Sequence, residues 1–160
     1  CLTAGIDCLE HVYYITQPQV ERVKKEDRWV VYTPSYALND QLLFKFSPHD
    51  REGSLREKEI ICKCLSGAIE GGLKFGIGTD GLHQGLAQEA CYISGLGAKN
   101  RDVLAGITIN AARICGADKS TGSIAEGKAA DFAVLEGNPL DDIEALKKVT
   151  SVIQDGTIIF

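Results

Sequence analysis

The sequence has no methionine, no long apolar run and no block of basic residues. No stretch approaches the roughly 18 apolar residues that a membrane-spanning helix requires, and no signal peptide opens the chain. The 17 Lys and Arg residues are scattered among 22 Asp and Glu residues, which gives a net charge of −5. We therefore expect no nucleic-acid partner, no membrane partner and a cytoplasmic location.

The absence of methionine extends to position 1. We therefore expect that the chain either begins downstream of the translation start or has been processed. The 160 residues, 44% hydrophobic and 24% charged, are otherwise typical of a globular protein of one domain or little more.

Six cysteines lie mostly in apolar segments, a setting typical of reduced thiols in a core. They are Cys1, Cys8, Cys62, Cys64, Cys91 and Cys115. Cys62 and Cys64 stand two residues apart, which places them on different sides of a helix and favours core packing over a metal pair. Cys1 leaves open a further alternative, an N-terminal nucleophile activated by its own amine.

The first two thirds of the chain alternate between strand and helix patterns. Strands are predicted at Gly5–Leu9, Trp29–Thr33 and Lys74–Gly78. Helices are predicted at Thr16–Lys25, from the Ser54–Glu57 capping box to Gly71-Gly72, at Leu86–Leu96 and at Arg101–Cys115. Turn residues between Ser35 and Gly53 predict a long functional loop. This alternation predicts an α/β fold with a parallel sheet.

After Gly122 the pattern changes to short strands and turns. Strands are predicted at Ala130–Leu135, Val149–Ile153 and Thr157–Phe160, with a short helix at Asp142–Lys148.

Two polar residues follow predicted strands, where parallel α/β folds place their chemistry: His11 after the first strand and Asp80 after the third. Imidazole and carboxylate groups are ligands that zinc takes in hydrolytic sites. The alternative is that His11 is a satisfied polar residue and Asp80 caps a turn. His83 is as typical of a surface loop as of a substrate contact, and Glu89 is more typical of a cap or surface charge than of a ligand.

Several segments together resemble a known family. They are FGIGTD at 75–80, VLAGITINAA at 103–112, TGSIAEGKAADFAVL at 121–135 and GNPLDDI at 137–143. With Glu10-His11 ahead of them, they resemble the C-terminal portion of the amidohydrolase superfamily, in its imidazolonepropionase-like and Xaa-Pro-dipeptidase-like branch.

The resemblance implies a fold and a set of roles. Residues 1–120 would form strands six to eight of a (β/α)8 TIM barrel, and residues 121–160 part of a small β-sandwich. It implies that His11 binds the second of one or two divalent metal ions, with zinc expected. It places metal contact and acid/base work on Asp80, and we expect Tyr36 and His83 to face a small or dipeptide-like substrate. The reaction would be hydrolysis of amide, peptide or cyclic-amide C–N bonds.

The chain departs from the family pattern because the earlier ligands, His-x-His and the ligands of strands four and five, are absent from it. We therefore expect the missing N-terminal part to complete the site, and the chain alone to bind metal weakly and be inactive. A homo-oligomer is compatible with this pattern. The alternative is a non-catalytic scaffold that completes its fold with a partner chain.

Overall fold

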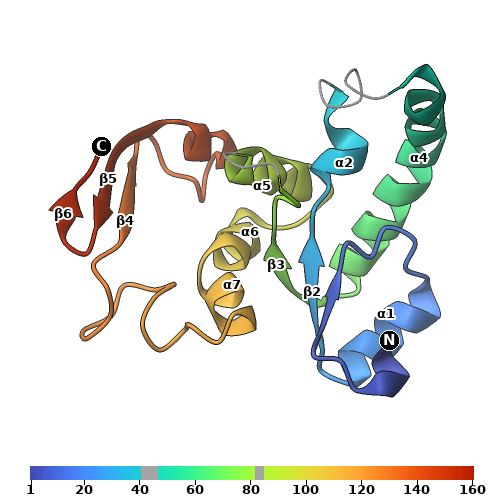
Figure 1. Cartoon of the computed structure of the whole chain (residues 1–160), viewed down its shortest axis with the longest axis horizontal. Coiled ribbons are helices and arrows are strands. Elements are labelled where there is room, and N and C mark those ends of the chain that lie inside the picture. Colours follow the sequence, from blue (N-terminus) through green and yellow to red (C-terminus); the bar gives the residue numbers. More distant parts are fainter. Residues whose placement is uncertain (41–46, 82–84) are drawn as a thin grey trace.

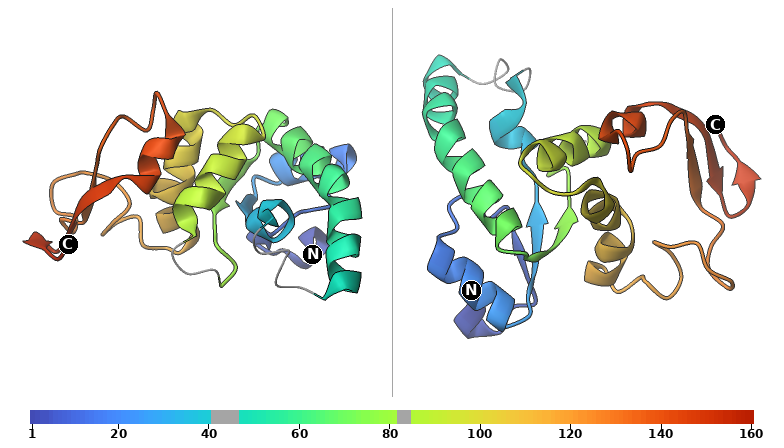
Figure 2. Two further views of the ribbon diagram at one scale, coloured as in Figure 1. Left: turned by 90° about the horizontal axis from the view of Figure 1, so that it is seen from above. Right: turned by 180° about the vertical axis from the view of Figure 1, so that it is seen from behind.

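The first sheet has helices on both sides, and one of these groups separates it from the second sheet, which lies at one end of the molecule (Figure 1). This computed structural model describes residues 1–40, 47–81 and 85–160. The views from above and behind show the same separation, with the N-terminus beside the first sheet and the C-terminus beside the second (Figure 2).

The first sheet is parallel and follows chain order. It consists of β1 (Cys8–Glu10), β2 (Trp29–Tyr32) and β3 (Lys74–Ile77). The register pairs Leu9 with Val30 and Val30 with Phe75. The predicted α/β fold with a parallel sheet is confirmed, and the carboxyl ends of all three strands lie at one edge.

Helices cover this sheet and enclose the core. They are α1 (Gln17–Lys25), α2 (Ser35–Leu38), α4 (Pro48–Glu70), α5 (Leu86–Gly95), α6 (Asn100–Ile107) and α7 (Ile109–Ile114). The predicted start of α1 is confirmed: the Thr16 N–H donates to Gln19 Oε1 at 2.8 Å. The fully buried core includes Val30, Tyr32, Leu65 and Ile93, so it lies between the sheet and α4 and α5.

The predicted loop between Ser35 and Gly53 is wrong where the structure describes it. Residues 35–38 form α2, and α4 begins at Pro48 rather than at the predicted Ser54–Glu57 capping box. Proline suits the first turn of a helix, because its missing N–H needs no partner there. The exposed Arg56–Glu52 pair, at 2.8 Å, then supports the next turns.

The single helix predicted at Arg101–Cys115 is also wrong, because it breaks at Thr108 (φ −126°, ψ −100°) into α6 and α7. The break lets both helices pack on β3. A Cβ at Gly106 would lie 2.9 Å from the Phe75 ring, so only glycine allows α6 this close. The Asn110 side chain donates to the Phe75 carbonyl at 3.0 Å and ties α7 to the same strand.

The first predicted strand begins later than expected. Residues Leu2–Ala4 form a short 3-10 helix, η1, which ends at Gly5 in a left-handed conformation (φ 77°). The strand then starts at Cys8 and ends at Glu10, directly before His11.

The second sheet is antiparallel and lies after residue 130. It consists of β4 (Phe132–Leu135), β5 (Val149–Gln154) and β6 (Thr157–Ile158), and η2 (Ile143–Lys147) precedes β5. The predicted hairpin and short helix are confirmed, although the helix is of the 3-10 type. η2 packs against α5, which joins this region to the rest of the chain.

None of the six cysteines is fully buried, which corrects the prediction of core thiols, although Cys91 packs against the core. Cys1 and Cys115 are exposed, and the other four are partly exposed. All six are free thiols. Within the described ranges, no helix is both long enough and apolar enough to cross a membrane.

Candidate active site

His11 and Asp80 follow the carboxyl ends of β1 and β3, and both have left-handed backbones. The φ angle is 69° at His11, 50° at Val12 and 46° at Asp80. Such angles cost non-glycine residues about 1–3 kcal/mol each, and they are found most often at functional sites. The His11 N–H still donates to the Val31 carbonyl at 2.9 Å, so the strand pairing continues up to the strained residue.

The His11 imidazole is held through one ring nitrogen. Nδ1 lies 2.8 Å from Thr33 Oγ1, and the Tyr13 hydroxyl lies 2.7 Å from the Thr33 carbonyl and 2.9 Å from Thr33 Oγ1. Tyr13 has one proton, which it donates to the carbonyl. With the Thr33 hydroxyl donating in turn to Tyr13 Oη, we infer that His11 Nδ1–H is the donor to Thr33 Oγ1. This proton count leaves His11 Nε2 with a free lone pair.

The Tyr13 ring lies next to this histidine and is itself near Tyr36 and the Asp80 carboxylate. The Tyr13 ring lies 5.6 Å from the His11 ring, and the Tyr36 ring stacks on Tyr13 at 6.3 Å. Burial raises the pKa of Tyr13, and the charge of Asp80 raises it further, against the lowering effect of its hydrogen bond with Thr33. The structure therefore places the His11 and Tyr36 rings both next to Tyr13, with Asp80 close enough to influence the Tyr13 hydroxyl.

Glu89 is the residue that the sequence interpretation missed. It was expected to be a cap or a surface charge, but in α5 it is completely buried. Its Oε2 accepts the Ser35 N–H at 2.9 Å, while Oε1 has no partner among the described residues. Burial raises the Glu89 pKa, and Asp80 adds to this effect. A signal was available, because Glu89 stands one helical turn before Ile93 on the buried face of α5.

His83 lies outside the described residues, so its expected substrate contact has no structural account. In residues 1–40, 47–81 and 85–160, no group of three or more His, Cys, Asp or Glu side chains is arranged to hold a metal ion. The two residues that are described fit a divalent cation by type: one imidazole with Nε2 free and one exposed carboxylate.

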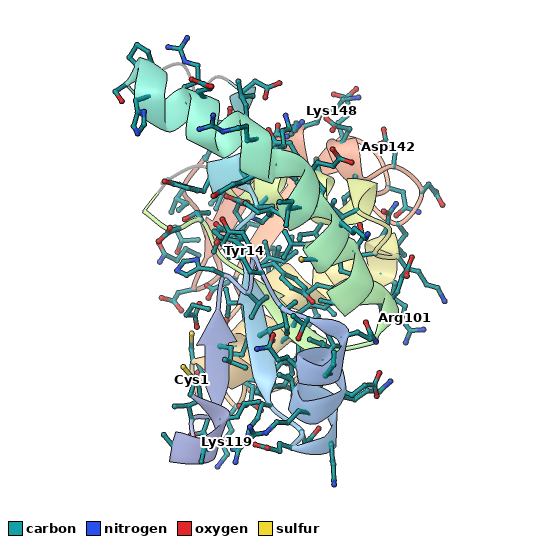
Figure 3. The ribbon with its side chains drawn as sticks, turned by 90° about the vertical axis from the view of Figure 1, so that its right-hand side faces the viewer. Cys1, Tyr14, Arg101, Lys119, Asp142 and Lys148 are labelled. Carbon is teal, nitrogen blue, oxygen red and sulfur yellow. The ribbon has the colours of Figure 1, made fainter. Side chains whose placement is uncertain are left out.

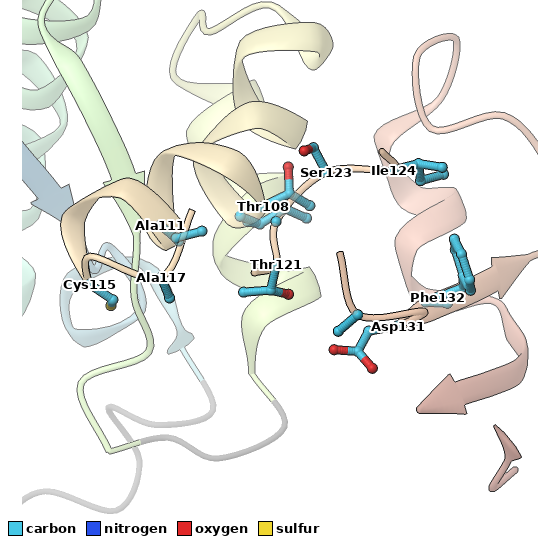
Figure 4. A pocket seen from close by; sticks show the side chains of 14 residues that line it. Thr108, Ala111, Cys115, Ala117, Thr121, Ser123, Ile124, Asp131 and Phe132 are labelled. Atoms are coloured by element: carbon cyan, nitrogen blue, oxygen red, sulfur yellow. The ribbon is translucent and has the colours of Figure 1, made fainter. Parts of the chain in front are cut away.

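A pocket lies elsewhere in the molecule, between α7 and β4 (Figure 4). Its volume is about 560 Å³, and small side chains such as Ala111, Ala117 and Thr121 line it. Asp131 is the only acidic residue among the described lining residues, and its Oδ1 already accepts the Asp155 N–H at 2.9 Å. The Cys115 thiol also lines this pocket, but neither His11 nor Asp80 is among the described lining residues, and we do not assign the chemistry to it.

Cys1 lies near the opposite end of β1 from Tyr14 (Figure 3). Tyr14 follows His11 closely along the chain, and its hydroxyl donates to Glu57 of α4. Cys1 thus lies away from the edge where the strands end.

Comparison with known proteins gives consistent matches along almost the whole chain. Residues 8–159 match the amidohydrolase family. Ochratoxinase from Aspergillus niger is 29% identical over 171 residues, and its crystal structure superimposes with a TM-score of 0.81 at 28% identity. A crystal structure of a Xaa-Pro dipeptidase with methionine bound in its active site gives a TM-score of 0.85 at 26% identity.

The matched proteins are longer than this chain. The match to ochratoxinase covers 98% of this chain but 34% of the curated sequence and 37% of the crystallised chain. The match to the dipeptidase covers 98% of this chain and 40% of that chain.

Proposed function

Because this chain belongs to the amidohydrolase family, we propose that it is part of a metal-dependent hydrolase of amide or peptide C–N bonds in a small, dipeptide-like substrate. The similarity to a Xaa-Pro dipeptidase and to ochratoxinase supports this substrate class. In this proposal β1, β2 and β3 are strands six to eight of a (β/α)8 barrel, and residues 121–160 belong to a separate β-sandwich.

The observation that carries the proposal is the arrangement of His11. Thr33 holds Nδ1 at 2.8 Å, so Nε2 is available to bind a divalent cation, with zinc as the expected ion. Asp80 follows β3, which is separated from β1 by β2 in the same sheet, and is the second proposed ligand. A bound divalent cation lowers the pKa of water and polarises a carbonyl.

Asp80 also has the proposed role of moving protons. Its exposed carboxylate can accept a proton from the attacking water and return it to the leaving nitrogen. One carboxylate would then serve both half-reactions. The remaining ligands would come from residues beyond this chain, which covers about 40% of the dipeptidase chain.

Tyr36 and His83 are the proposed substrate contacts. The Tyr36 side chain is 48% exposed and stacks on Tyr13, the tyrosine that lies next to His11, so it presents an aromatic surface there. An apolar or cyclic side chain of a dipeptide would pack on this ring.

The test is a substitution in the full-length gene product. Asp80→Asn keeps the shape of the side chain but removes its basicity, and we expect kcat for dipeptide hydrolysis to fall by about 10²–10⁴-fold. Asp27→Asn is the matched control, because Asp27 also has a positive φ (54°) but pairs with Lys74 at the amino ends of the strands. Chelation should abolish the activity, and zinc should restore it. Full activity in Asp80→Asn would overturn the proposal.

A second candidate function is a non-catalytic scaffold, and one observation favours it. Ile158 is 71% exposed, Phe160 is 70% exposed and Ile124 is 86% exposed, so the C-terminal region presents apolar side chains to solvent. If assembly is the function, Ile158→Lys combined with Phe160→Ser will abolish association in light scattering. If hydrolysis is the function, the same variant will retain its kcat.

A further inference from the structure

We propose that Glu89 is a positioning residue that aims the His11 imidazole, acting through the Thr33–Ser35 segment. Glu89 contacts neither His11 nor any atom that would react. Its effect would pass from α5 to the end of β2, and from there to the end of β1.

The first link joins α5 to the segment after β2. Glu89 is completely buried, and its Oε2 accepts the Ser35 N–H at 2.9 Å. Ser35 is itself only 2% exposed, so its N–H has no access to water as a substitute partner. Losing this acceptor would leave a buried donor unsatisfied, which is costly enough to move the segment.

The second link is the stiffness of Pro34. Its φ is −65° and its ψ is −17°, and the residue is fully buried. Since the proline ring fixes φ, ψ of Pro34 is the one soft backbone torsion between the Thr33 carbonyl and the Ser35 N–H. Glu89 holds this segment on one side of Pro34, and the Tyr13 hydroxyl holds the Thr33 carbonyl on the other at 2.7 Å.

The third link is the contact between Thr33 and His11. Thr33 Oγ1 lies 2.8 Å from His11 Nδ1 and accepts its proton in the Nδ1–H tautomer. A displaced Thr33 would lose this contact, and the imidazole would be free to adopt the other tautomer. Glu89 therefore helps to decide which ring nitrogen has the free lone pair.

A carboxyl group at this position is not explained by packing. Burying it with one oxygen unpartnered is costly, and an apolar residue of similar size would avoid that cost. Burial and Asp80 raise its pKa while its hydrogen bonds with Ser35 lower it, and the carboxyl group can accept the Ser35 N–H in either protonation state. The Ser35 N–H requires a hydrogen-bond acceptor at this position, and it does not require a negative charge.

The test measures the tautomer of His11 in the 160-residue chain. Ring ¹⁵N chemical shifts distinguish the two tautomers at a pH where the ring is neutral, and His11→Gln assigns the signal among the three histidines. The parent chain should show the Nδ1–H form. Glu89→Gln, which keeps an acceptor, should leave it unchanged, whereas Glu89→Leu should give a mixture.

Two further variants separate positioning from general destabilisation. Glu89→Asp shortens the side chain and should also give a mixture of tautomers. It replaces Glu89→Leu as the test if Glu89→Leu does not fold. Ile93→Ala removes a buried group from the same helix without touching Ser35, and should leave the tautomer unchanged. The proposal is overturned if Glu89→Leu and Glu89→Asp both keep the Nδ1–H form, or if Ile93→Ala shifts it equally.

The consequence for metal binding rests on the proposed function. If His11 is a ligand, Glu89→Asp should also weaken zinc binding in the full-length gene product by about 10–100-fold. A changed tautomer with unchanged zinc affinity would reject His11 as a ligand while the positioning role stands.

Discussion

The parallel region, residues 1–116, and the C-terminal region, residues 117–160, use polar side chains in different ways. In the parallel region Thr33, Ser35 and Glu89 are buried, and their hydrogen bonds lead toward a histidine with a free ring nitrogen. In the C-terminal region, Lys128 and Asp131 bond mainly to backbone groups.

The difference shows that the sequence segment most typical of the family is not the one that supplies the proposed catalytic residues. Lys128 lies in the stretch GSIAEGKAAD, and its ammonium donates to the carbonyls of Asp118 and Thr121 and to Ser123 Oγ at 2.7 Å. It therefore closes a long loop. Asp131 accepts the Asp155 N–H and so holds the turn before β6. These residues build the fold, and the proposed reaction uses others.

The largest expected effect concerns where the stability lies. Leu65→Ala removes a fully buried side chain from the parallel region and should lower the free energy of unfolding by about 2–5 kcal/mol. Ile158→Ala, at a position 71% exposed in the C-terminal region, should change it by less than about 0.5 kcal/mol. Urea unfolding measures both. Equal losses in the free energy of unfolding would mean that side chains in the two regions contribute equally to stability.

A smaller effect separates folding from chemistry within the C-terminal region. Lys128→Met removes the donor for two backbone carbonyls and should cost about 1–3 kcal/mol of stability. Lys119→Met is the matched control on the same loop, where the lysine is exposed, and should be nearly neutral. The His11 tautomer should be unchanged in both. A shifted tautomer in Lys128→Met would show that the two regions are coupled.

The smallest effect is a pH dependence that belongs to the parallel region. The pKa of Glu89 is raised in the folded chain above its ordinary value of 4.5, because burial disfavours the charged form. Between these two pKa values the folded state binds more protons than the unfolded state, so stability falls as the pH rises through that window. Glu89→Gln should remove this decline.

Urea midpoints measured from pH 4.5 upward give the comparison, with the exposed Glu21→Gln as control. If the parent and Glu89→Gln profiles run parallel, Glu89 has the same pKa in both states.

The positions of His11 and Asp80 could be read from the sequence because the signals are local. Each follows a short apolar strand, and parallel strands place their carboxyl ends at one edge. Their contacts could not be read in this way. Whether Thr33 meets His11 depends on the register that pairs Glu10 with Val31, and no local pattern specifies it.

Two predicted elements, the loop at 35–53 and the single helix at 101–115, are wrong because tertiary packing outweighs the local pattern. Pro48 and Gly53 are turn residues by type, yet both lie in α4, since proline is accepted in a first turn and the packing of the helix outweighs one glycine. The pattern from Arg101 to Cys115 is helical throughout, yet it breaks at Thr108 so that α6 and α7 can both contact β3.

The sequence by itself determined the α/β alternation, the parallel sheet, the family and the two residues that follow β1 and β3, because periodicity, caps and motifs act over a few residues. Only the tertiary structure decided the burial of Glu89, the nitrogen of His11 that is free and the break at Thr108. These depend on segments far apart in the chain: Glu89 meets Ser35 because α5 packs on α2, and Thr33 meets His11 because β1 pairs with β2.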